Sequence, residues 1–291
     1  MRAEPATSDH GYYGRPVLKE PVWKPEVAVY FWLGGLAGMS AVLGFAARLA
    51  GNQRLARSAW VTAFAALLPC PPLLIVDLGR PERFYNMLRM FKPTSPMSVG
   101  TWVLTAFSGV TTAALAGELL GGIFARLGRV AEGAAALLGL PLATYTAVLL
   151  ADTSVPVWHH ARHHLPFVFA GSATACAGAA AAVLTPSRHS RPARLTAIIG
   201  ALLELGAVLA MERRLGPDGR HYHEGAAAGP AKAARALTGG GAVLMALGGR
   251  RPLALAAGGL LLAGSLAERF AVLRAGPSSA RATAGGGTVQ G

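Results

Sequence analysis

Charged residues are scarce in this chain of 291 residues. Asp, Glu, Lys and Arg together make up 14% of it, whereas 53% of the residues are hydrophobic and the mean hydropathy is +0.42. A chain of this composition has too little polar surface to coat a soluble globule. The scarcity of charge therefore excludes an ordinary soluble domain and indicates an integral membrane protein.

Cysteine is also scarce, and histidine is missing from the places where a haem would need it. Cys70 and Cys176 are too few to supply the four thiolates of an ordinary iron–sulfur cluster. All eight histidines fall outside the uncharged runs, so no imidazole pair is placed to hold a haem between membrane helices. The sequence therefore predicts no haem, no iron–sulfur cluster and no metal in this chain.

The two ends of the chain lack long apolar runs. Residues 1–26 are polar and contain several prolines, without the basic start, short apolar core and small-residue cleavage site of a signal peptide. Residues 276–291 have little to bury and are expected to be disordered. No basic run is long or interleaved with aromatics, so the net charge of +13 suits anionic lipid headgroups and not nucleic acid. A transmembrane bundle is expected between the ends, at 27–275.

Long uncharged runs are what the chain has instead. Five of them reach about the 20 residues that a helix needs to cross a bilayer. Three later candidates are shorter or carry Glu204, and short Gly- and Ala-rich helices can still span when flanking Arg and Lys side chains reach the headgroups. We therefore predict an all-α integral membrane protein, a polytopic bundle of about eight transmembrane helices. Their expected ranges are 27–48, 58–76, 98–119, 132–151, 165–184, 195–211, 234–248 and 252–272.

Charge and histidine are divided unevenly between the two faces of such a bundle. Lys and Arg are more numerous on the face that holds both termini, which favours cytoplasmic termini by the positive-inside rule. Every histidine except His189 falls on that same face. These residues either fill the longer loops or mark the face that carries the chemistry. The expected location is the cell membrane, with multiple passes through the lipid bilayer.

The second predicted helix contains three prolines, Pro69, Pro71 and Pro72. A proline in a helix interior removes a hydrogen-bond donor and clashes with the preceding turn, at a cost of about 3 kcal/mol. The helix should therefore break or kink there. Disrupted backbone at membrane depth is tolerated where it packs inside protein or lines a polar cavity. The break is either a packing kink or a sign of a site.

A charged segment, "DLGRPERFYNMLRMFKPTSPMS" (77–98), follows the break. Phe84, Met87, Leu88 and Phe91 are spaced i, i+3, i+4 and i+7, which puts them on one side of a short helix. We expect this helix to lie in the membrane interface with its apolar side toward the lipid. Its arginines, Arg80 among them, would be free for headgroups, an acidic partner surface or Asp77.

Four stretches of the sequence together resemble a known family. They are "DLGRPERFYNML…SPMSVGTW" from position 77, "YYGRPVLKEPVWKPEVAVYFWLGGLAGMS" (12–40), "YTAVLLADTSVPVWHHARHHLPFVFAGSA" (145–173) and "ERFAVLRAG" (268–276). These motifs are similar to those of the NrfD-like membrane subunits of polysulfide reductase and related molybdenum or iron–sulfur oxidoreductases. The likeness covers nearly the whole chain.

The resemblance implies a function. Such subunits bind a menaquinone-type quinone among their first four helices and exchange electrons with a peripheral, four-cluster ferredoxin-like iron–sulfur subunit, which in turn serves a molybdopterin oxidoreductase subunit. The scarcity of cysteine and the placement of histidine agree with this role. A chain without a redox centre of its own must pass electrons directly between a bound organic carrier and a partner.

Candidate site residues follow from what a quinone needs: an apolar slot, hydrogen bonds to its carbonyls and a proton route. Tyr145 is the leading carbonyl partner, because the family places a functional tyrosine in this helix; a lone tyrosine is otherwise often an interfacial anchor. Asp77 and Asp152 are the candidates for proton exchange, although Asp77 could instead form a structural pair with Arg80. The further candidates for quinone binding are Tyr30, Trp32, Arg80, Ser98, Trp102 and His159. Of Tyr30 and Trp32, we expect one to pack and the other to line the slot.

Two other classes of protein share some of these features. A transporter or channel would also explain the broken second helix and Glu204, and it predicts an internal repeat relating the two halves. The second half has no counterpart to the three prolines or to the Asp-Leu-Gly-Arg-Pro segment. A purely structural membrane anchor is the other alternative. It predicts that Tyr145 and Asp77 tolerate substitution as long as the partner docks.

Overall fold

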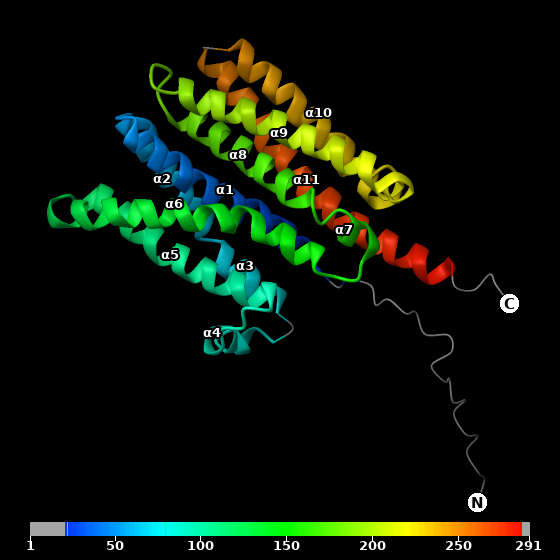
Figure 1. Ribbon diagram of the computed structural model, residues 1–291. Coiled ribbons are helices and arrows are strands. Elements are labelled where there is room, and N and C mark those ends of the chain that lie inside the picture. The colour runs from blue at the N-terminus through cyan, green and yellow to red at the C-terminus, as the bar shows by residue number, and fades with distance from the viewer. Residues whose placement is uncertain (1–20, 22, 79, 249, 287–291) are drawn as a thin grey trace, which may run out of the picture.

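The computed structural model describes residues 21–286 except residues 22, 79 and 249 (Figure 1). Its described part is helical throughout, without strands. The longer helices are α1 (Pro25–Leu49), α2 (Gln53–Leu67), α3 (Cys70–Asp77), α5 (Pro96–Leu120), α6 (Gly122–Ala151), α8 (Leu165–Leu184), α9 (Arg191–Leu215), α10 (Gly225–Leu247) and α11 (Arg251–Gly286). Short helical segments connect them: η1 (Pro81–Arg83), α4 (Asn86–Arg89), α7 (Pro156–His160) and η2 (Gly216–Tyr222).

Seven helical spans in the described part of the chain are long and apolar enough to cross a membrane, with α2 and α3 together forming one of them. The exception among the long helices is α10, which carries Lys232 and Arg235 and packs along α11 and α9. The prediction of an all-α, multi-pass membrane protein is confirmed, and a bundle of about eight crossings fits it.

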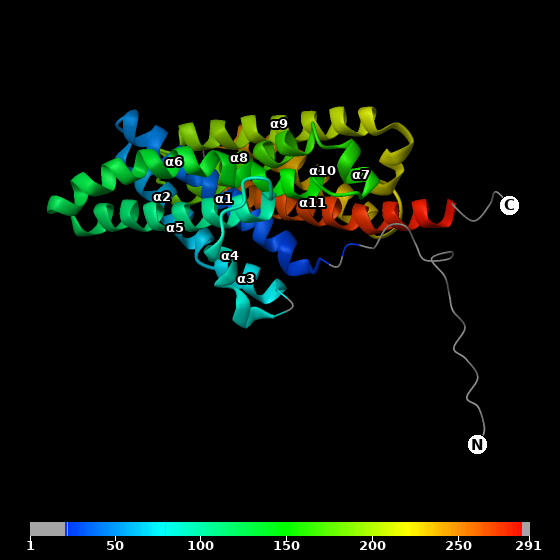
Figure 2. The same cartoon turned by 60° about the horizontal axis from the view of Figure 1, so that its bottom comes forward.

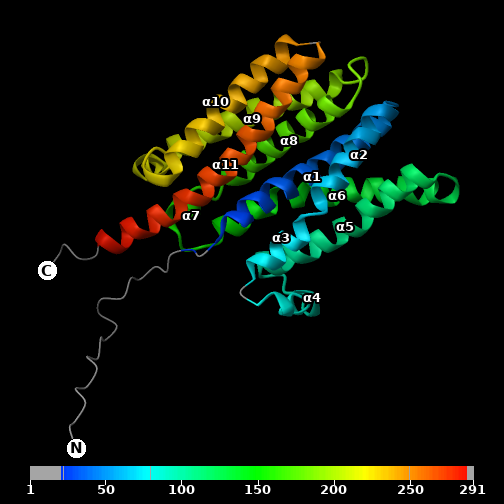
Figure 3. The same cartoon turned by 180° about the vertical axis from the view of Figure 1, so that it is seen from behind.

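The helices form two groups that meet along α1 and α8 (Figures 1 and 3). One group contains α1, α2, α3, α5 and α6, and the other contains α8 to α11. The start of α1, the short helices α4 and α7, η2 and the end of α11 all lie toward one end of the bundle (Figures 1 and 2). We call this end the terminal face.

Small residues let α1 sit at the centre of the bundle. A Cβ atom on Gly38 would lie 2.4 Å from the carbonyl oxygen of Gly139, so α1 and α6 touch backbone to backbone. On another side of α1, a Cβ on Gly35 would lie 3.1 Å from the Cβ of Ala173 in α8. Gly34, on the same helix, has nothing within 4 Å of its Cβ position.

The predicted break in the second span is confirmed. Helix α2 ends at Leu67 and α3 begins at Cys70, with Pro69 between them. Pro71 and Pro72 fall in the first turn of α3, where a missing N–H costs little because that group has no partner inside the helix. The prolines thus divide one long apolar run into two helices, of which the second ends at Asp77.

The charged segment after α3 forms short helical pieces in place of one continuous interfacial helix. We call residues 81–95 the lid; it contains η1 and the four-residue α4. Phe84 and Leu88 line a groove against α3 and α5, together with Met87. Phe91 lies beyond the end of α4 and packs edge-on against Trp102. Three of the four predicted apolar positions therefore share one surface, and the fourth packs separately.

The expected disordered tail is wrong over residues 276–286, which continue α11. Ser279 and Ala280 are 2% and 1% exposed, and the Ser279 hydroxyl accepts a hydrogen bond from the backbone N–H of Val157 at 3.1 Å. Gly276 packs against the indole of Trp158. Small residues that seemed to offer nothing to bury are therefore what allows the end of α11 to pack against α7. Residues 287–291 lie outside the described part.

The expected polar N-terminal segment, 1–26, lies mostly outside the described residues, and so does His10. Of its last residues, Pro25 and Glu26 already belong to α1.

Candidate functional site

Two tyrosines from different helices meet inside the bundle. The hydroxyl of Tyr30 in α1 hydrogen-bonds the hydroxyl of Tyr145 in α6. Tyr30 is 2% exposed, whereas Tyr145 is half-buried, with its ring against the backbone of Gly100 in α5. Both tyrosines were candidates from the sequence, and the structure brings them together.

A cavity of about 40 Å³ lies beside this tyrosine pair. Its polar lining consists of Tyr30, Tyr145, Asp77 and Thr101, and the rest is apolar or aromatic. The lining side chains come from α1, α3, α4, α5, α6 and the residues just before α1. The remaining lining residues are Trp23, Val27, Phe31, Leu74, Met87, Met97 and Leu149.

Two open grooves, each of about 240 Å³, adjoin this cavity. One runs between α3 and α5 under Phe84 and Leu88, and the other lies under the lid beside Ser98. Met87 and Thr101 line the cavity and both grooves. The cavity alone holds little more than a water molecule. A flexible methionine side chain, that of Met87, therefore stands between the small chamber and two larger grooves.

Asp77 is the last residue of α3, is half-buried and is one of the residues that line the cavity beside the tyrosines. Within the described part of the chain it forms no hydrogen bond or ion pair, and Arg80 is exposed and does not line the cavity. The structure therefore gives no support to an Asp77–Arg80 pair that pins the loop. It places Asp77 where a ligand of the cavity would meet it.

Ser98 and Trp102 hold the lid in place. The Ser98 hydroxyl donates to the carbonyl of Met90 at 3.2 Å and accepts from the backbone N–H of Lys92 at 3.0 Å. Trp102 Nε1 donates to the same Met90 carbonyl at 3.4 Å. Ser98 also lines the groove under the lid, but neither residue lines the central cavity. Their hydrogen bonds position the segment that carries Met87.

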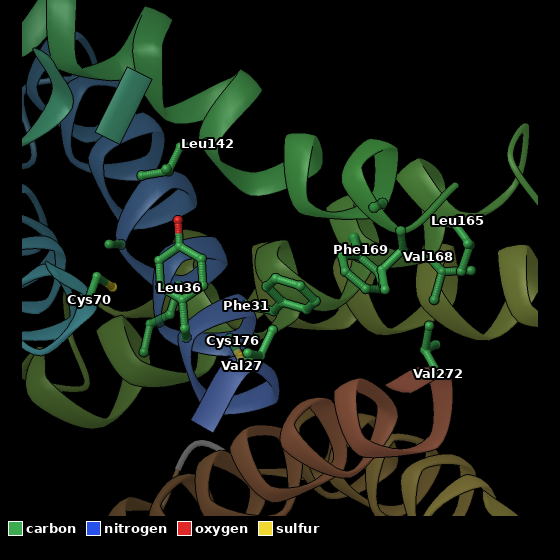
Figure 4. Close-up of a cluster of buried hydrophobic side chains, with 14 of the residues drawn as sticks. Val27, Phe31, Leu36, Cys70, Leu142, Leu165, Val168, Phe169, Cys176 and Val272 are labelled. Carbon is green, nitrogen blue, oxygen red and sulfur yellow. The ribbon is translucent and has the colours of Figure 1, made fainter. Parts of the chain in front are cut away.

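Trp32 packs between helices, whereas Tyr30 lines the cavity. Trp32 Nε1 donates to the Sγ atom of Cys176 in α8 at 3.3 Å, away from the cavity lining. Figure 4 shows that α1 carries Phe31 toward Phe169 of α8 in the same region. Trp32 thus joins the two halves of the bundle.

Asp152 and His159 lie on the surface, outside the cavity. Asp152 caps the end of α6, two turns beyond Tyr145, and its side chain is exposed. His159 is exposed in α7, where its Nε2 atom lies 3.3 Å from a guanidinium nitrogen of Arg162. Its neighbour His160 pairs with Asp218 at 2.7 Å. These residues share the terminal face with the cavity but do not contact it.

Sequence reasoning missed most of the apolar lining, although one signal was present. Trp23, Val27 and Tyr30 have the i, i+4 and i+7 spacing of one helix side, although Trp23 itself precedes α1, which begins at Pro25. Trp23 also stacks on Trp158 of α7, with ring centres 5.4 Å apart. Met97, Leu74 and Leu149 carried no comparable signal, because only the packing of α3, α5 and α6 brings them together.

Among the described residues, no three His, Cys, Asp or Glu side chains gather closely enough to hold a metal ion. What gathers at the cavity is a pair of hydroxyls and one carboxylate inside an apolar wall. Such a site can orient an apolar ligand that carries a few polar atoms and can exchange protons with it. Fold and site together define a multi-pass membrane protein with a small, apolar-walled chamber near one face.

The chain belongs to the family described as polysulphide reductase, NrfD, which matches residues 17–217. This match confirms the family resemblance, does not reach the motif at 268–276, and includes every residue that lines the cavity. The family consists of membrane subunits of quinone-linked oxidoreductases, which assemble with iron–sulfur and molybdopterin subunits. No curated protein matches the chain.

Proposed function

We propose that this chain binds menaquinone or menaquinol in the chamber lined by Tyr30, Tyr145 and Asp77. It exchanges electrons there with a peripheral, four-cluster ferredoxin-like iron–sulfur subunit, which serves a molybdopterin subunit. The observation that carries the proposal is the convergence of these three polar groups, from three different helices, on one apolar chamber. Family membership supplies the ligand class.

The residues present suit a quinone in kind. When bound, the quinone supplies two-electron, two-proton redox chemistry. The chain supplies an apolar wall, two phenol hydroxyls and a carboxylate. In size, the chamber is far below the roughly 300–1,000 Å³ of ordinary ligand pockets. Displacing Met87 would join it to the two grooves of about 240 Å³, so binding requires this side chain to move.

The tyrosine pair can present one hydroxyl proton to a ligand. Each phenol has one O–H, and in the Tyr30–Tyr145 bond one hydroxyl donates while the other accepts. The accepting hydroxyl keeps its own proton free for a further acceptor. Tyr30 is almost fully buried and Tyr145 is more open, so we assign the contact with a carbonyl oxygen to Tyr145.

Asp77 is positioned to hold or move a proton between the chamber and the terminal face. It ends α3, and in the described part of the chain no other side chain pairs with it. General acid–base catalysis by a positioned carboxylate contributes about 10²–10⁴-fold to a rate. Asp152 and His159, which are exposed on the same face, would exchange protons with water there and not with the ligand itself.

The test uses the purified complex with its partner subunits and measures electron flow to a quinone analogue. Tyr145→Phe and Asp77→Asn should lower the rate, with the larger loss for Asp77→Asn. Tyr85→Phe and Asp152→Asn are the matched controls, because both residues are exposed and lie outside the chamber. Unchanged rates in both chamber variants would refute the residue assignments and favour a structural anchor. A complex without bound or reducible quinone would refute the function.

A further inference from the structure

The second half of the bundle contains three ionisable side chains that the chamber does not use. Glu204 in α9 and Glu268 and Arg269 in α11 are 2%, 3% and 1% exposed. All three lie on helices long and apolar enough to span the membrane. Ionisable groups at such a depth are costly, and they are typically paired or functional.

These three groups are only partly satisfied by the protein. Arg269 donates from Nη2 to the carbonyl of Phe169 at 3.1 Å, and its guanidinium carbon lies 3.6 Å from the centre of the Phe169 ring. Its Nε and Nη1 atoms have no hydrogen-bond partner within the described residues, and the same holds for Oε2 of Glu204. Neither Glu204 nor Glu268 forms an ion pair within 4.0 Å of Arg269 in that part of the chain.

The balance of charge in this cluster is uneven. Glu204 has Glu268 and Arg269 as its charged neighbours, with Ser172 of α8 beside it. Glu268 also interacts with Arg235 of α10 and Glu212 of α9. Arg235 is already held by Glu212 in an ion pair. Two buried carboxylates therefore share one buried guanidinium, and a net negative charge in a low-dielectric interior is strongly disfavoured. One retained proton makes the cluster neutral.

We propose that Glu204, Glu268 and Arg269 form a buried proton-binding site, in which the two carboxyl groups together hold one exchangeable proton. The ligand of this site is the proton, delivered by water that the unpartnered polar atoms can bind. The site is separate from the quinone chamber, and its existence does not depend on the proposed function.

A row of polar groups leads from this cluster to the terminal face. Tyr222 of η2 is 2% exposed, its hydroxyl has no hydrogen-bond partner among the described residues, and its charged neighbours are Glu268 and Glu212. Glu212 lies 3.5 Å from Nε2 of His223, which is exposed. The geometry thus gives the proton a way out through Tyr222, Glu212 and His223.

Aromatic rings connect the proton site to the wall of the chamber. Arg269 lies over the ring of Phe169, whose centre is 6.2 Å from that of Phe31, and Phe31 lines the chamber. Figure 4 shows Phe31 and Phe169 facing each other between α1 and α8. Two packed rings thus separate the guanidinium of Arg269 from the chamber. A role of this contact in the redox chemistry, unlike the site itself, rests on the proposed function.

The test is infrared spectroscopy of the full chain in lipid nanodiscs at neutral pH, without quinone. The wild type should show the carbonyl stretch of one protonated carboxylic acid. Glu204→Gln and Glu268→Gln should each abolish it, because the remaining carboxylate then balances Arg269. Glu132→Gln is the matched control and should leave it unchanged: Glu132 is 3% exposed, but it is ion-paired with Arg48.

A variant that removes the positive charge should change the band in the opposite direction. Arg269→Met removes the guanidinium, so both carboxyl groups should be protonated and the band should double. Thermal unfolding of each variant checks that it is folded; if Arg269→Met does not fold, the two glutamine variants still decide. A wild type without the band, or a band that survives in both glutamine variants, would overturn the proposal.

The rate of deuterium exchange at the carboxyl group tests separately the proposed exit of the proton through Tyr222, Glu212 and His223. Replacing His223 with Ala should slow deuterium exchange of the carboxyl proton without removing the band. His163→Ala, another exposed histidine on the terminal face, should have no effect. Equal exchange in both variants would refute the exit through His223.

Discussion

A Cβ atom on Gly100 would lie 2.1 Å from the ring carbon Cε2 of Tyr145. Real side chains do not approach so closely, so the phenol occupies space that only glycine leaves free. Helix α5 thereby presses the Tyr145 ring toward α1, where its hydroxyl meets Tyr30. The position of the leading ligand-binding group depends on a residue that has no side chain.

Gly100→Ala should therefore displace the Tyr145 ring and break its bond to Tyr30. The displaced Tyr145 hydroxyl would also lose its hydrogen bond to the quinone carbonyl. A bond worth about 1.4 kcal/mol corresponds to an affinity for a quinone analogue about tenfold weaker. The measurement is a binding titration of the purified protein. Gly109→Ala on the same helix is the control, since nothing lies within 4 Å of its Cβ position. Equal affinities in the two variants would show that the ring position does not matter.

Met87→Ala should open the chamber. Its side chain lines the chamber and both grooves, so shortening it joins these spaces and should accelerate the binding of a bulky quinone analogue. Stopped-flow fluorescence gives the association rate. Met90→Ala serves as the control, because Met90 is 71% exposed and lines the groove under the lid but not the chamber. If Met87→Ala and Met90→Ala give the same association rate, Met87 does not limit the entry of the analogue.

Arg48→Met should destabilise the first half of the bundle. Arg48 joins α1 to Glu118 of α5 and Glu132 of α6, and Glu132 is buried. Removing the cation leaves a buried carboxylate unpaired, which costs about 3–5 kcal/mol in such cases. Thermal unfolding in detergent should show a clear loss, whereas Arg54→Met, at an exposed position, should change little. Adding Glu132→Gln to Arg48→Met should restore part of the stability; a double variant no more stable than the single one would contradict this explanation.

Ser279→Ala should loosen α7. The Val157 N–H loses its acceptor in a buried position, and an unsatisfied buried donor costs about 1–3 kcal/mol. Amide hydrogen exchange of residues 157–160 should become faster. Ser187→Ala, at an exposed position on the opposite face, should leave that exchange as it is. Unchanged protection in Ser279→Ala would mean that the end of α11 does not support α7.

Helix positions were predictable from uncharged runs only where the helices contain no charge. Helix α8 has the expected bounds, Leu165–Leu184. Helix α6 begins at Gly122 and not at 132, and α10 begins at Gly225 and not at 234. The added turns carry Arg126, Arg129 and Lys232, which are exposed. Arg and Lys are good helix formers, so a helix continues through them after the hydropathy signal has ended.

Site residues were predictable where chemistry and position coincided. Tyr145 and Asp77 stood out as polar groups at membrane depth or at its edge, and both line the chamber. Arg80, Asp152 and His159 had suitable chemistry on the correct face, but the structure leaves them exposed outside it. Sequence spacing fixes which residues share a helix side, whereas a chamber between five helices depends on distances that spacing does not contain.

The backbone carbonyl of Met90 attaches the lid to α5. Both Ser98 and Trp102 donate hydrogen bonds from α5 to this carbonyl, whereas the backbone N–H groups of residues 84 and 87 bond to carbonyls within the lid itself. The lid is therefore tied to α5 at Met90, and Phe84 and Met87 lie toward its other edge. That edge faces the groove between α3 and α5, whose outer side chains are apolar. A ligand that enters along this groove would come sideways from the hydrocarbon core of the bilayer. It would therefore have to be soluble in lipid before it could bind.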